Sequence, residues 1–347
     1  MQGGAKMAVA TIKDIAKLAN VSVATVSRVL NDSNRVTEKT KNIVLAVMEE
    51  NNYMPNEIAR SLSKRETNTI GVVVPDINNP FFGKVIKGIS SISDKEDLYM
   101  LLCDTDENEE KELKFLDMLV RQRIRGLIIT PTMNNDEFNP EYMKALAKLN
   151  IPIVLIDRDV KYSNFDGVFS DDIEGSYQAV DCLIKEGHEK IAIIAGPITS
   201  KPGRDRFRGY TKAIEMNGLA VDDKYVHYGD FKLESGYELT KKILSMKEPP
   251  TALFVSNNMM NLGCIKALAE LKLEIGKDIG LIGFDEVEML EIMGINVSVV
   301  DRPMERMGVR AMMILKDRLE NPKVKEEDVQ RIILHPTLKL RGSEKKK

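Results

Sequence analysis

The chain has 347 residues, a formal net charge of −3 and a hydrophobic fraction of 43%, which suits two or three domains with ordinary cores. No run approaches the roughly 18 apolar residues of a membrane span, and no signal peptide opens the sequence. Cys103, Cys182 and Cys264 lie far apart, which argues against disulfides and a zinc site and fits a reducing cytoplasm.

The charge is unevenly distributed along the chain. Residues 1–66 carry ten lysines and arginines against seven aspartates and glutamates, whereas the remainder is acidic. A basic N-terminal part on an acidic body predicts that a surface facing nucleic-acid phosphates lies at the N-terminus.

Two short helices are expected in residues 11–30. In the first, apolar residues recur at helical spacing, and Thr11 and Asp14 form a capping-box pattern at its start. After a break at Asn20, Ser22 is a natural N-cap for the second helix. Two helices joined by a tight turn form a helix-turn-helix, whose second helix lies in the DNA major groove. A helical hairpin that only packs is the alternative.

The start of the second helix supplies candidate base contacts. Arg28 can donate two hydrogen bonds to guanine, while Val23 and Ala24 can offer apolar contact, for example to a thymine methyl. The candidate DNA contacts in this part of the chain are Thr11, Ser22, Val23, Ala24, Thr25, Ser27, Arg28, Asn31, Arg35 and Thr37.

A third helix is expected to complete a small core, with Thr37 as its cap. Its core face is expected to carry Ile43, Val44, Val47 and Met48. Arg35, in the loop before it, is either a phosphate or base contact or a solvated loop charge. Thr37 would face DNA phosphates, which position a protein without reading sequence.

The segments VSVATVSRVLN and YMPNEIARSL, with the third helix between them, resemble the DNA-binding headpiece of the lactose-repressor family of bacterial transcription regulators. The likeness continues over nearly the whole chain. It implies a hinge helix that pairs in a dimer and lies in the minor groove. Asn56 would cap this helix, Ala59 would let two copies approach closely, and Leu62 would wedge between base steps. The alternative for Leu62 is an exposed linker residue.

From Thr69 onward, short apolar strands alternate with amphipathic helices, which predicts a doubly wound α/β architecture. Buried parallel strands are expected at 70–76, 98–105, 126–132, 151–159, 167–172, 190–197, 251–257 and 279–286. Two such halves resemble the periplasmic sugar-binding fold that forms the body of the family.

The expected organisation is therefore an α-helical headpiece followed by a two-lobed, periplasmic-binding-protein-like α/β body. The headpiece is expected at residues 1–54, the hinge helix and linker at 55–68, and the effector-binding and dimerisation body at 69–343. Within the body, the N-lobe is expected to comprise 69–168 and 298–328, and the C-lobe 169–297 and 329–343.

Ligands of open α/β sheets bind beyond the carboxyl ends of the strands, so two facing lobes would line one cleft. Polar and aromatic residues gather at these ends: Asp76, Asn79, Phe81, Phe82, Asp157, Arg158, Arg204, Phe231, Asn257, Asp285 and Asp301. Aromatic faces suit the CH surface of a sugar ring, and charged groups suit its hydroxyls. NNPFF, DRD, GRDRFRGY, GDF and GFD are similar to ribose-type sugar-binding proteins, which implies a monosaccharide or close derivative.

Two positions depart from the pattern of the family. The family usually has Asn-Asp-x-x-Ala at residues 257–261, where this chain has Asn-Asn-Met-Met-Asn. Asp301 stands where a glutamine is common. The candidate cleft residues also have structural alternatives. Phe81 and Phe82 could belong to the core at a helix start, and Asp285 could only cap the segment after its strand.

Asp157 and Arg158 could form a structural pair. Arg158 and Arg204 could together bind a sugar acid or a phosphate, because arginine grips such anions with two hydrogen bonds.

The sequence predicts a dimeric, sugar-responsive repressor with no cofactor, metal site, catalytic residues or membrane partner. Its expected partners are a palindromic DNA operator, a sugar effector and a second copy of itself. Two alternatives stay open: a regulator of the same family controlled by a protein corepressor, and a sugar-metabolising α/β enzyme.

Overall fold

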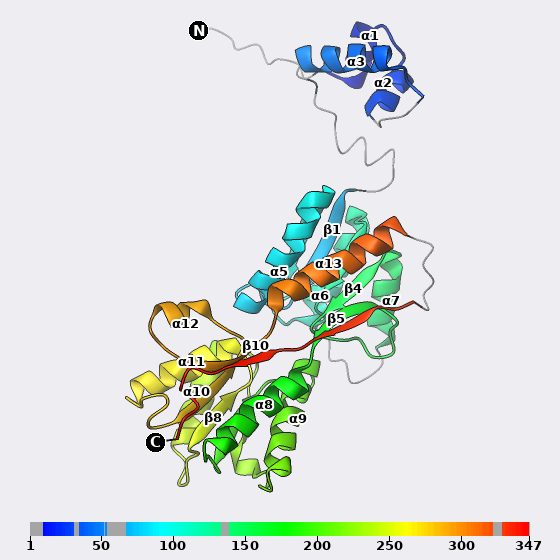
Figure 1. Cartoon of the computed structure of the whole chain (residues 1–347). Coiled ribbons are helices and arrows are strands. Elements are labelled where there is room, and N and C mark those ends of the chain that lie inside the picture. The colour runs from blue at the N-terminus through cyan, green and yellow to red at the C-terminus, as the bar shows by residue number, and fades with distance from the viewer. Residues whose placement is uncertain are drawn as a thin grey trace, which may run out of the picture. The chain divides into compact units, whose positions relative to one another are not determined.

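The computed structural model describes residues 10–30, 35–51, 53, 67–132, 139–321 and 328–346. The chain divides into two units, Met1–Thr67 and Asn68–Lys347, each of which is considered by itself (Figure 1).

The first unit contains α1 (Ile12–Leu18), α2 (Val23–Leu30) and α3 (Glu38–Glu50) in its described residues. The predicted caps of α1 and α3 are confirmed: Thr11 and Asp14 form a reciprocal capping box, and Thr37 accepts a hydrogen bond from the backbone of α3. Asn20 adopts a left-handed conformation at φ +50°, which Asn tolerates better than most residues. This turn separates α1 from α2.

A small apolar core joins the three helices, and its buried members are Ile15, Ala16, Ala19, Val26, Val29, Val44 and Met48. The prediction that Ile43 lies on the core face of α3 is wrong, because its side chain is 44% exposed. Val44 and Met48, one helical turn apart, define the buried stripe, and Ile43 is rotated away from it.

The second unit is built on two six-stranded sheets. The N-lobe sheet has the order β11-β5-β4-β3-β1-β2, with β1 (Thr69–Val74), β2 (Tyr99–Asp104), β3 (Gly126–Ile129), β4 (Ile153–Ile156), β5 (Asp166–Ser170) and β11 (Arg331–Leu334). The C-lobe sheet has the order β12-β10-β9-β8-β6-β7, with β6 (Ile191–Ala195), β7 (Val226–Tyr228), β8 (Ala252–Val255), β9 (Gly280–Phe284), β10 (Ser298–Asp301) and β12 (Thr337–Lys339). Neighbouring strands are parallel, except that β12 runs antiparallel to β10.

Helices cover both faces of each sheet, as expected for buried parallel strands. In the N-lobe, α5 (Pro80–Ser93) and α13 (Met304–Glu320) cover one face, and α6 (Glu109–Gln122) and α7 (Pro140–Leu149) cover the other. In the C-lobe, α8 (Asp172–Lys185) and α9 (Lys201–Met216) cover one face, and α10 (Leu233–Leu244) and α11 (Asn258–Glu270) cover the other. Three shorter helices are η1 (Asp94–Glu96), η2 (Asp223–Tyr225) and α12 (Glu288–Ile292).

Two strands join the opposite lobe from the one predicted. β10 opens the piece 298–328 that was assigned to the N-lobe, yet it pairs with β9 in the C-lobe sheet. β11 lies in the piece 329–343 that was assigned to the C-lobe, yet it pairs with β5 in the N-lobe sheet. The apolar pattern of a strand does not specify which sheet it joins, so the sequence could not place these crossovers. Figure 1 shows the C-terminal segment, in red, passing from one lobe to the other.

Within the described residues, no helix combines the length and apolar character that crossing a bilayer requires.

Candidate functional site

The first candidate surface is the start of α2. Ser22 accepts a hydrogen bond from the backbone N–H of Thr25 at 3.1 Å and so caps the helix. Val26 is buried in the core, which fixes the rotation of α2 and leaves Val23, Ala24 and Arg28 exposed. Arg28 lies one turn beyond Ala24 on the same side. The exposed residues therefore form one face that can meet a DNA groove while α2 stays packed.

The other predicted DNA contacts differ in their exposure to solvent. Thr25 and Ser27 are half-buried, whereas Thr11, Ser22, Arg35 and Thr37 are exposed. Asn31, Asn56, Ala59 and Leu62 lie outside the described residues.

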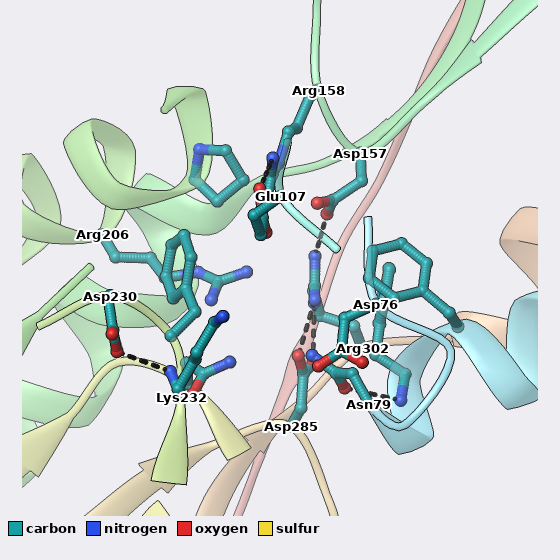
Figure 2. A pocket seen from close by; sticks show the side chains of 15 residues that line it. Asp76, Asn79, Glu107, Asp157, Arg158, Arg206, Asp230, Lys232, Asp285 and Arg302 are labelled. Carbon is teal, nitrogen blue, oxygen red and sulfur yellow. Dashed lines mark hydrogen bonds and ion pairs between the residues drawn. The ribbon is translucent and has the colours of Figure 1, made fainter. Parts of the chain in front are cut away.

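The second candidate site is a cleft between the lobes, at the carboxyl ends of the parallel strands (Figure 2). It encloses about 490 Å³, part of which is open to solvent. Its lining residues are Asp76, Asn79, Phe81, Phe82, Glu107, Asp157, Arg158, Pro202, Arg206, Asp230, Phe231, Lys232, Asn257, Asp285 and Arg302.

Nine of the eleven predicted residues line this cleft: Asp76, Asn79, Phe81, Phe82, Asp157, Arg158, Phe231, Asn257 and Asp285. Arg204 and Asp301 do not. The Arg204 guanidinium donates to the carbonyls of Ile198 and Thr199 at 3.1 and 2.9 Å. Asp301 pairs with Lys339 of β12 at 2.8 Å.

The structure puts Arg206 and Arg302 in the cleft in place of these two residues. Arg206 is two residues after the predicted Arg204, and Arg302 is one residue after the predicted Asp301. The predictions missed because only one face of a helix or strand end points toward the cleft. The helical period of α9 was the signal that could have selected Arg206 among its arginines. Glu107, Pro202, Asp230 and Lys232 were also missed.

Arg302 lies between the lobes and is only 4% exposed. Its Nε and Nη2 donate to the two carboxylate oxygens of Asp285 at 2.7 and 2.6 Å, and its Nη1 donates to Asp157 (Figure 2). The guanidinium also stacks on Phe81, 4.0 Å from the ring centroid. Burial by itself lowers the pKa of Arg302, but the carboxylates of Asp285 and Asp157 hold that pKa well above its usual value.

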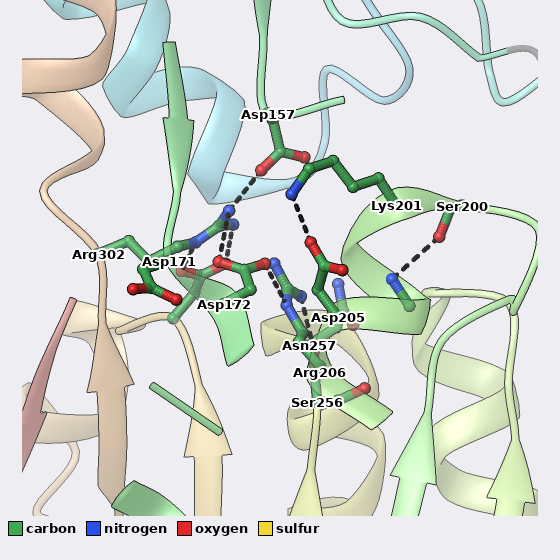
Figure 3. Close-up of polar contacts among 12 residues, drawn as sticks. Asp157, Asp171, Asp172, Ser200, Lys201, Asp205, Arg206, Ser256, Asn257 and Arg302 are labelled. Carbon is green, nitrogen blue, oxygen red and sulfur yellow. Dashed lines mark hydrogen bonds and ion pairs between the residues drawn. The ribbon is translucent and has the colours of Figure 1, made fainter. Parts of the chain in front are cut away.

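Arg206 forms a second buried ion pair beside the first. Its Nε donates to Asp172 at 2.8 Å and its Nη1 donates to the carbonyl of Ser256 at 2.6 Å. Burial raises the pKa of Asp172, but Arg206 and Arg302 outweigh it and hold that pKa below its usual value. Figure 3 shows the two arginines on either side of this carboxylate.

Arg158 is held by Glu107 through two hydrogen bonds of 2.7 and 2.6 Å. Burial by itself lowers the pKa of Arg158, but these bonds and the Glu107 charge keep it raised. The Arg158 Nε is buried and has no protein partner among the described residues. Buried N–H groups normally have an acceptor, so this one is an unsatisfied donor beside the cleft in the described part of the chain.

Asn79 and Asn258 connect the lobes at the edge of the cleft. Asn79 Oδ1 caps α5 by accepting from the backbone N–H of Phe81 at 3.0 Å. The same oxygen accepts from Asn258 Nδ2 of α11 at 2.9 Å. The departure from the family pattern at position 258 therefore supplies a hydrogen-bond donor between the lobes.

No cluster of His, Cys, Asp and Glu in the described ranges has the arrangement of a metal site. The charged groups of the cleft are instead suited to binding a polar organic molecule, with hydrogen bonds from side chains of both lobes.

Comparison with known proteins covers both units. Residues 11–56 match the family described as "Bacterial regulatory proteins, lacI family". Residues 67–340 match "Periplasmic binding proteins and sugar binding domain of LacI family". The HTH-type transcriptional repressor PurR of Pasteurella multocida is 34% identical over 97% of this chain and 99% of its own length. PurR of Proteus mirabilis is 35% identical over 96% of each protein.

Solved structures of the same family are also similar. The lac repressor dimer bound to operator and the anti-inducer ONPF has a TM-score of 0.84 at 26% identity, over 98% of this chain and 100% of that chain. A transcriptional regulator CelR–cellobiose complex has a TM-score of 0.71 at 26% identity, over 96% and 99% of the two chains. These relatives are transcriptional regulators rather than enzymes. The chain belongs to the lacI family of bacterial regulatory proteins, as a DNA-binding transcriptional repressor with a sugar-binding domain.

Proposed function

We propose that the protein represses transcription as a homodimer on a pseudo-palindromic operator, with α2 in the major groove. Arg28 would donate to a guanine edge, and Val23 and Ala24 would contact apolar groups beside it. The exposed face of α2 supports this assignment, as does the similarity to a lac repressor dimer bound to operator. Twofold symmetry in the protein requires two half-sites in the DNA.

The hinge residues Asn56, Ala59 and Leu62 are proposed to form a minor-groove helix in the operator complex. A wedge residue is stabilised there because the bend it causes brings more protein surface against the DNA. The switch between helix and coil in this segment would respond to the relative angle of the lobes.

The effector is proposed to be a monosaccharide or close derivative that binds between the lobes. The observation that carries this proposal is that side chains of both lobes line one cleft, with Arg302 held between Asp157 and Asp285. A molecule that bonds to both walls changes how the lobes are joined. Converting such a switch from 1:99 to 99:1 needs about 5.5 kcal/mol of differential binding. The CelR–cellobiose complex and an Enterococcus faecium regulator with bound ribose, of TM-score 0.70 and 26% identity, support a sugar.

The operator assignment is tested by selecting a duplex from a random pool and measuring its affinity by fluorescence anisotropy. Arg28→Ala should lose base preference, because it removes the forked donor. Leu62→Ala should weaken operator binding and leave sugar affinity intact. Lys144→Ala, an exposed change on α7, is the matched control. No preference for any palindromic duplex over random DNA would overturn the proposal.

The effector assignment is tested by titration calorimetry with a panel of monosaccharides and their derivatives. A binder should change operator affinity, and Asp285→Asn should weaken its binding. If none of them binds while operator binding is retained, the regulator controlled by a protein corepressor becomes the better interpretation.

A further inference from the structure

The charges that line the cleft do not balance, and the cations are already paired. Arg158 is held by both oxygens of Glu107. Lys232 Nζ lies 3.6 Å from Asp106 of the N-lobe. Both cations therefore already lie beside a carboxylate, although the pair of Lys232 with Asp106 is exposed and weaker than the buried pair of Arg158 with Glu107.

The two buried arginines are paired as well, and one of them is shared by two carboxylates. Arg206 pairs with Asp172 at 2.8 Å. Arg302 bonds to both Asp285 and Asp157. One guanidinium therefore faces two carboxylates and leaves one negative charge in excess.

Two further carboxylates line the cleft from opposite walls. Asp76 follows β1 of the N-lobe and accepts the backbone N–H of Asn78 at 2.8 Å. Asp230 follows β7 of the C-lobe and accepts the backbone N–H of Lys232 at 2.9 Å. Among the described side chains, neither has a lysine or arginine partner within salt-bridge distance. Figure 2 shows Asp76 near Arg302 and Asn79, and Asp230 beside Lys232.

Among the described residues, three negative charges thus remain around the cleft: one from the carboxylates that share Arg302, one from Asp76 and one from Asp230. A ligand with a carboxylate or phosphate would add like charge to this surplus, and the arginines that could bind it already have carboxylate partners. A cationic group would instead meet an unpaired carboxylate on either wall.

We propose that the effector is a hydroxylated amine, of which an amino sugar is the simplest kind. This rests on the proposed function, because it assigns the charge of the molecule that binds the same cleft. An ammonium group offers three donors to carboxylate oxygens, and Asp76 and Asp230 provide such acceptors. The buried Nε of Arg158, with no acceptor in the described chain, would donate to a hydroxyl or ring oxygen. Phe231, which also lines the cleft and lies 5.9 Å from the Arg158 guanidinium, would contact the apolar side of the sugar ring.

The test compares sugars that differ only in charge, with the full-length protein and titration calorimetry. One set is glucose, glucosamine, glucuronic acid and glucose 6-phosphate, and a second set has the same four forms of galactose. We expect the amine to bind about tenfold more tightly than its neutral parent, the effect of one added ion pair. We expect no binding of the acid or the phosphate.

Equal affinity of amine and neutral parent, tighter binding of an acid or phosphate, or no binding in either set would each overturn the proposal. If a neutral sugar binds and changes operator affinity, the charge assignment fails while the proposed function stands. If no duplex is preferred in the operator test, the proposed function fails independently.

Two variants test which carboxylates recognise the positive charge of the ligand. Asp76→Asn and Asp230→Asn should each reduce the preference for amine over neutral sugar several-fold and weaken its dependence on ionic strength. Asp223→Asn, in η2 outside the cleft, is the matched control and should leave the preference unchanged. Unchanged preference in both cleft variants would show that neither carboxylate reads the charge of the ligand.

Discussion

The N-lobe and the C-lobe repeat one topology without a recognisable sequence repeat. Their sheet orders correspond strand by strand, from β11-β5-β4-β3-β1-β2 to β12-β10-β9-β8-β6-β7, except that the edge strand β11 is parallel to its neighbour and β12 is antiparallel. Asp157 after β4 and Asp285 after β9 occupy equivalent places, and both have left-handed backbones, at φ +65° and +67°. Aspartate tolerates this conformation better than most residues. The two lobes therefore aim matching carboxylates at the same guanidinium.

The lobes differ in how they hold that guanidinium. Arg302 directly follows β10 of the C-lobe sheet, and it makes two hydrogen bonds with Asp285 of the same lobe but one with Asp157 of the N-lobe. The bonds to Asp285 can persist when the lobes move, whereas the bond to Asp157 crosses between them. We therefore infer that the bond between Arg302 and Asp157 is the one that breaks when the lobes move apart.

The largest effect is expected from removing the shared group. Arg302→Met keeps much of the side-chain volume but leaves two buried carboxylates without their cation. Breaking a buried ion pair by removal of one partner costs about 3–5 kcal/mol. We expect a loss of this size in the free energy of unfolding, measured by urea denaturation. Arg208→Met, at an exposed position of α9, is the control, and a loss below about 1 kcal/mol for Arg302→Met would contradict the shared ion pair.

The asymmetry between the carboxylates predicts a smaller, ordered pair of effects. Asp285→Asn replaces two charge-assisted hydrogen bonds within the C-lobe, each in the class that contributes about 1.5–3 kcal/mol. Asp157→Asn replaces one, so we expect it to cost less in urea denaturation. Because that bond crosses the cleft, Asp157→Asn should also increase the radius of gyration in small-angle X-ray scattering more than Asp285→Asn does. The reverse order in both measurements would place the point of separation at Asp285.

Most of the cleft residues could be predicted from the sequence because the pattern that marks them extends over only a few neighbouring residues. A short apolar strand followed by a polar residue marks the carboxyl end of a parallel strand, and these ends meet at one edge. Asp157 and Asp285 could be found in this way. The choice between Arg302 and Asp301 depends on which way the chain turns after β10, and that turn is set by pairing with β9 and β12. The sequence alone does not contain this geometry.

The prediction of which lobe β10 and β11 belong to was wrong for a related reason. β10 and β11 are assigned by partners far away in the chain, and an apolar strand suits either sheet equally well. The headpiece shows the opposite case: the capping box of Thr11 and Asp14 acts over three residues, so the pattern alone predicted the start of α1. Among the described residues of the headpiece, the prediction for Ile43 was wrong, because its burial depends on how α3 is rotated about its axis.

A third prediction concerns the direct bond between the lobes. Asn79 Oδ1 is fixed by capping α5, so only a donor can face it from Asn258. Asn258→Asp would place a carboxylate against this oxygen, and we expect effector affinity to fall about tenfold, or about 1.4 kcal/mol, in calorimetry. Asn79→Asp is the matched control, because it keeps an acceptor for the Phe81 backbone N–H and for Asn258 Nδ2. Its radius of gyration in small-angle scattering should therefore equal that of the wild type. Equal opening by the two variants would show that the bond does not join the lobes.

The smallest effect tests a difference in how the two lobes pack their helices. The fourth residue of α10 is Gly236, where a Cβ atom would lie 2.1 Å from the Met260 carbonyl of α11. The fourth residue of α6 is Glu112, which is fully buried and accepts hydrogen bonds from Tyr142 of α7 and from the backbone of Thr132. The C-lobe joins its two helices by direct contact, whereas the N-lobe joins them through a buried carboxyl.

Burial raises the pKa of Glu112, and the hydrogen bonds from Tyr142 and Thr132 only partly offset this. A carboxyl whose folded-state pKa is raised contributes most stability when protonated, and that contribution is lost as pH rises from the unfolded pKa through the folded one. Glu112→Gln keeps an acceptor for the Thr132 backbone N–H, and its amide N–H can donate to the Tyr142 oxygen in place of the bond that Tyr142 now donates. As pH rises, the wild type should lose stability that the variant does not lose. The free energy of unfolding of the variant should therefore rise relative to that of the wild type by on the order of 1 kcal/mol. A difference that stays constant from pH 4.5 to pH 8 would mean that Glu112 carries the same charge in the folded and unfolded protein, and the contrast between the lobes would then be one of shape alone.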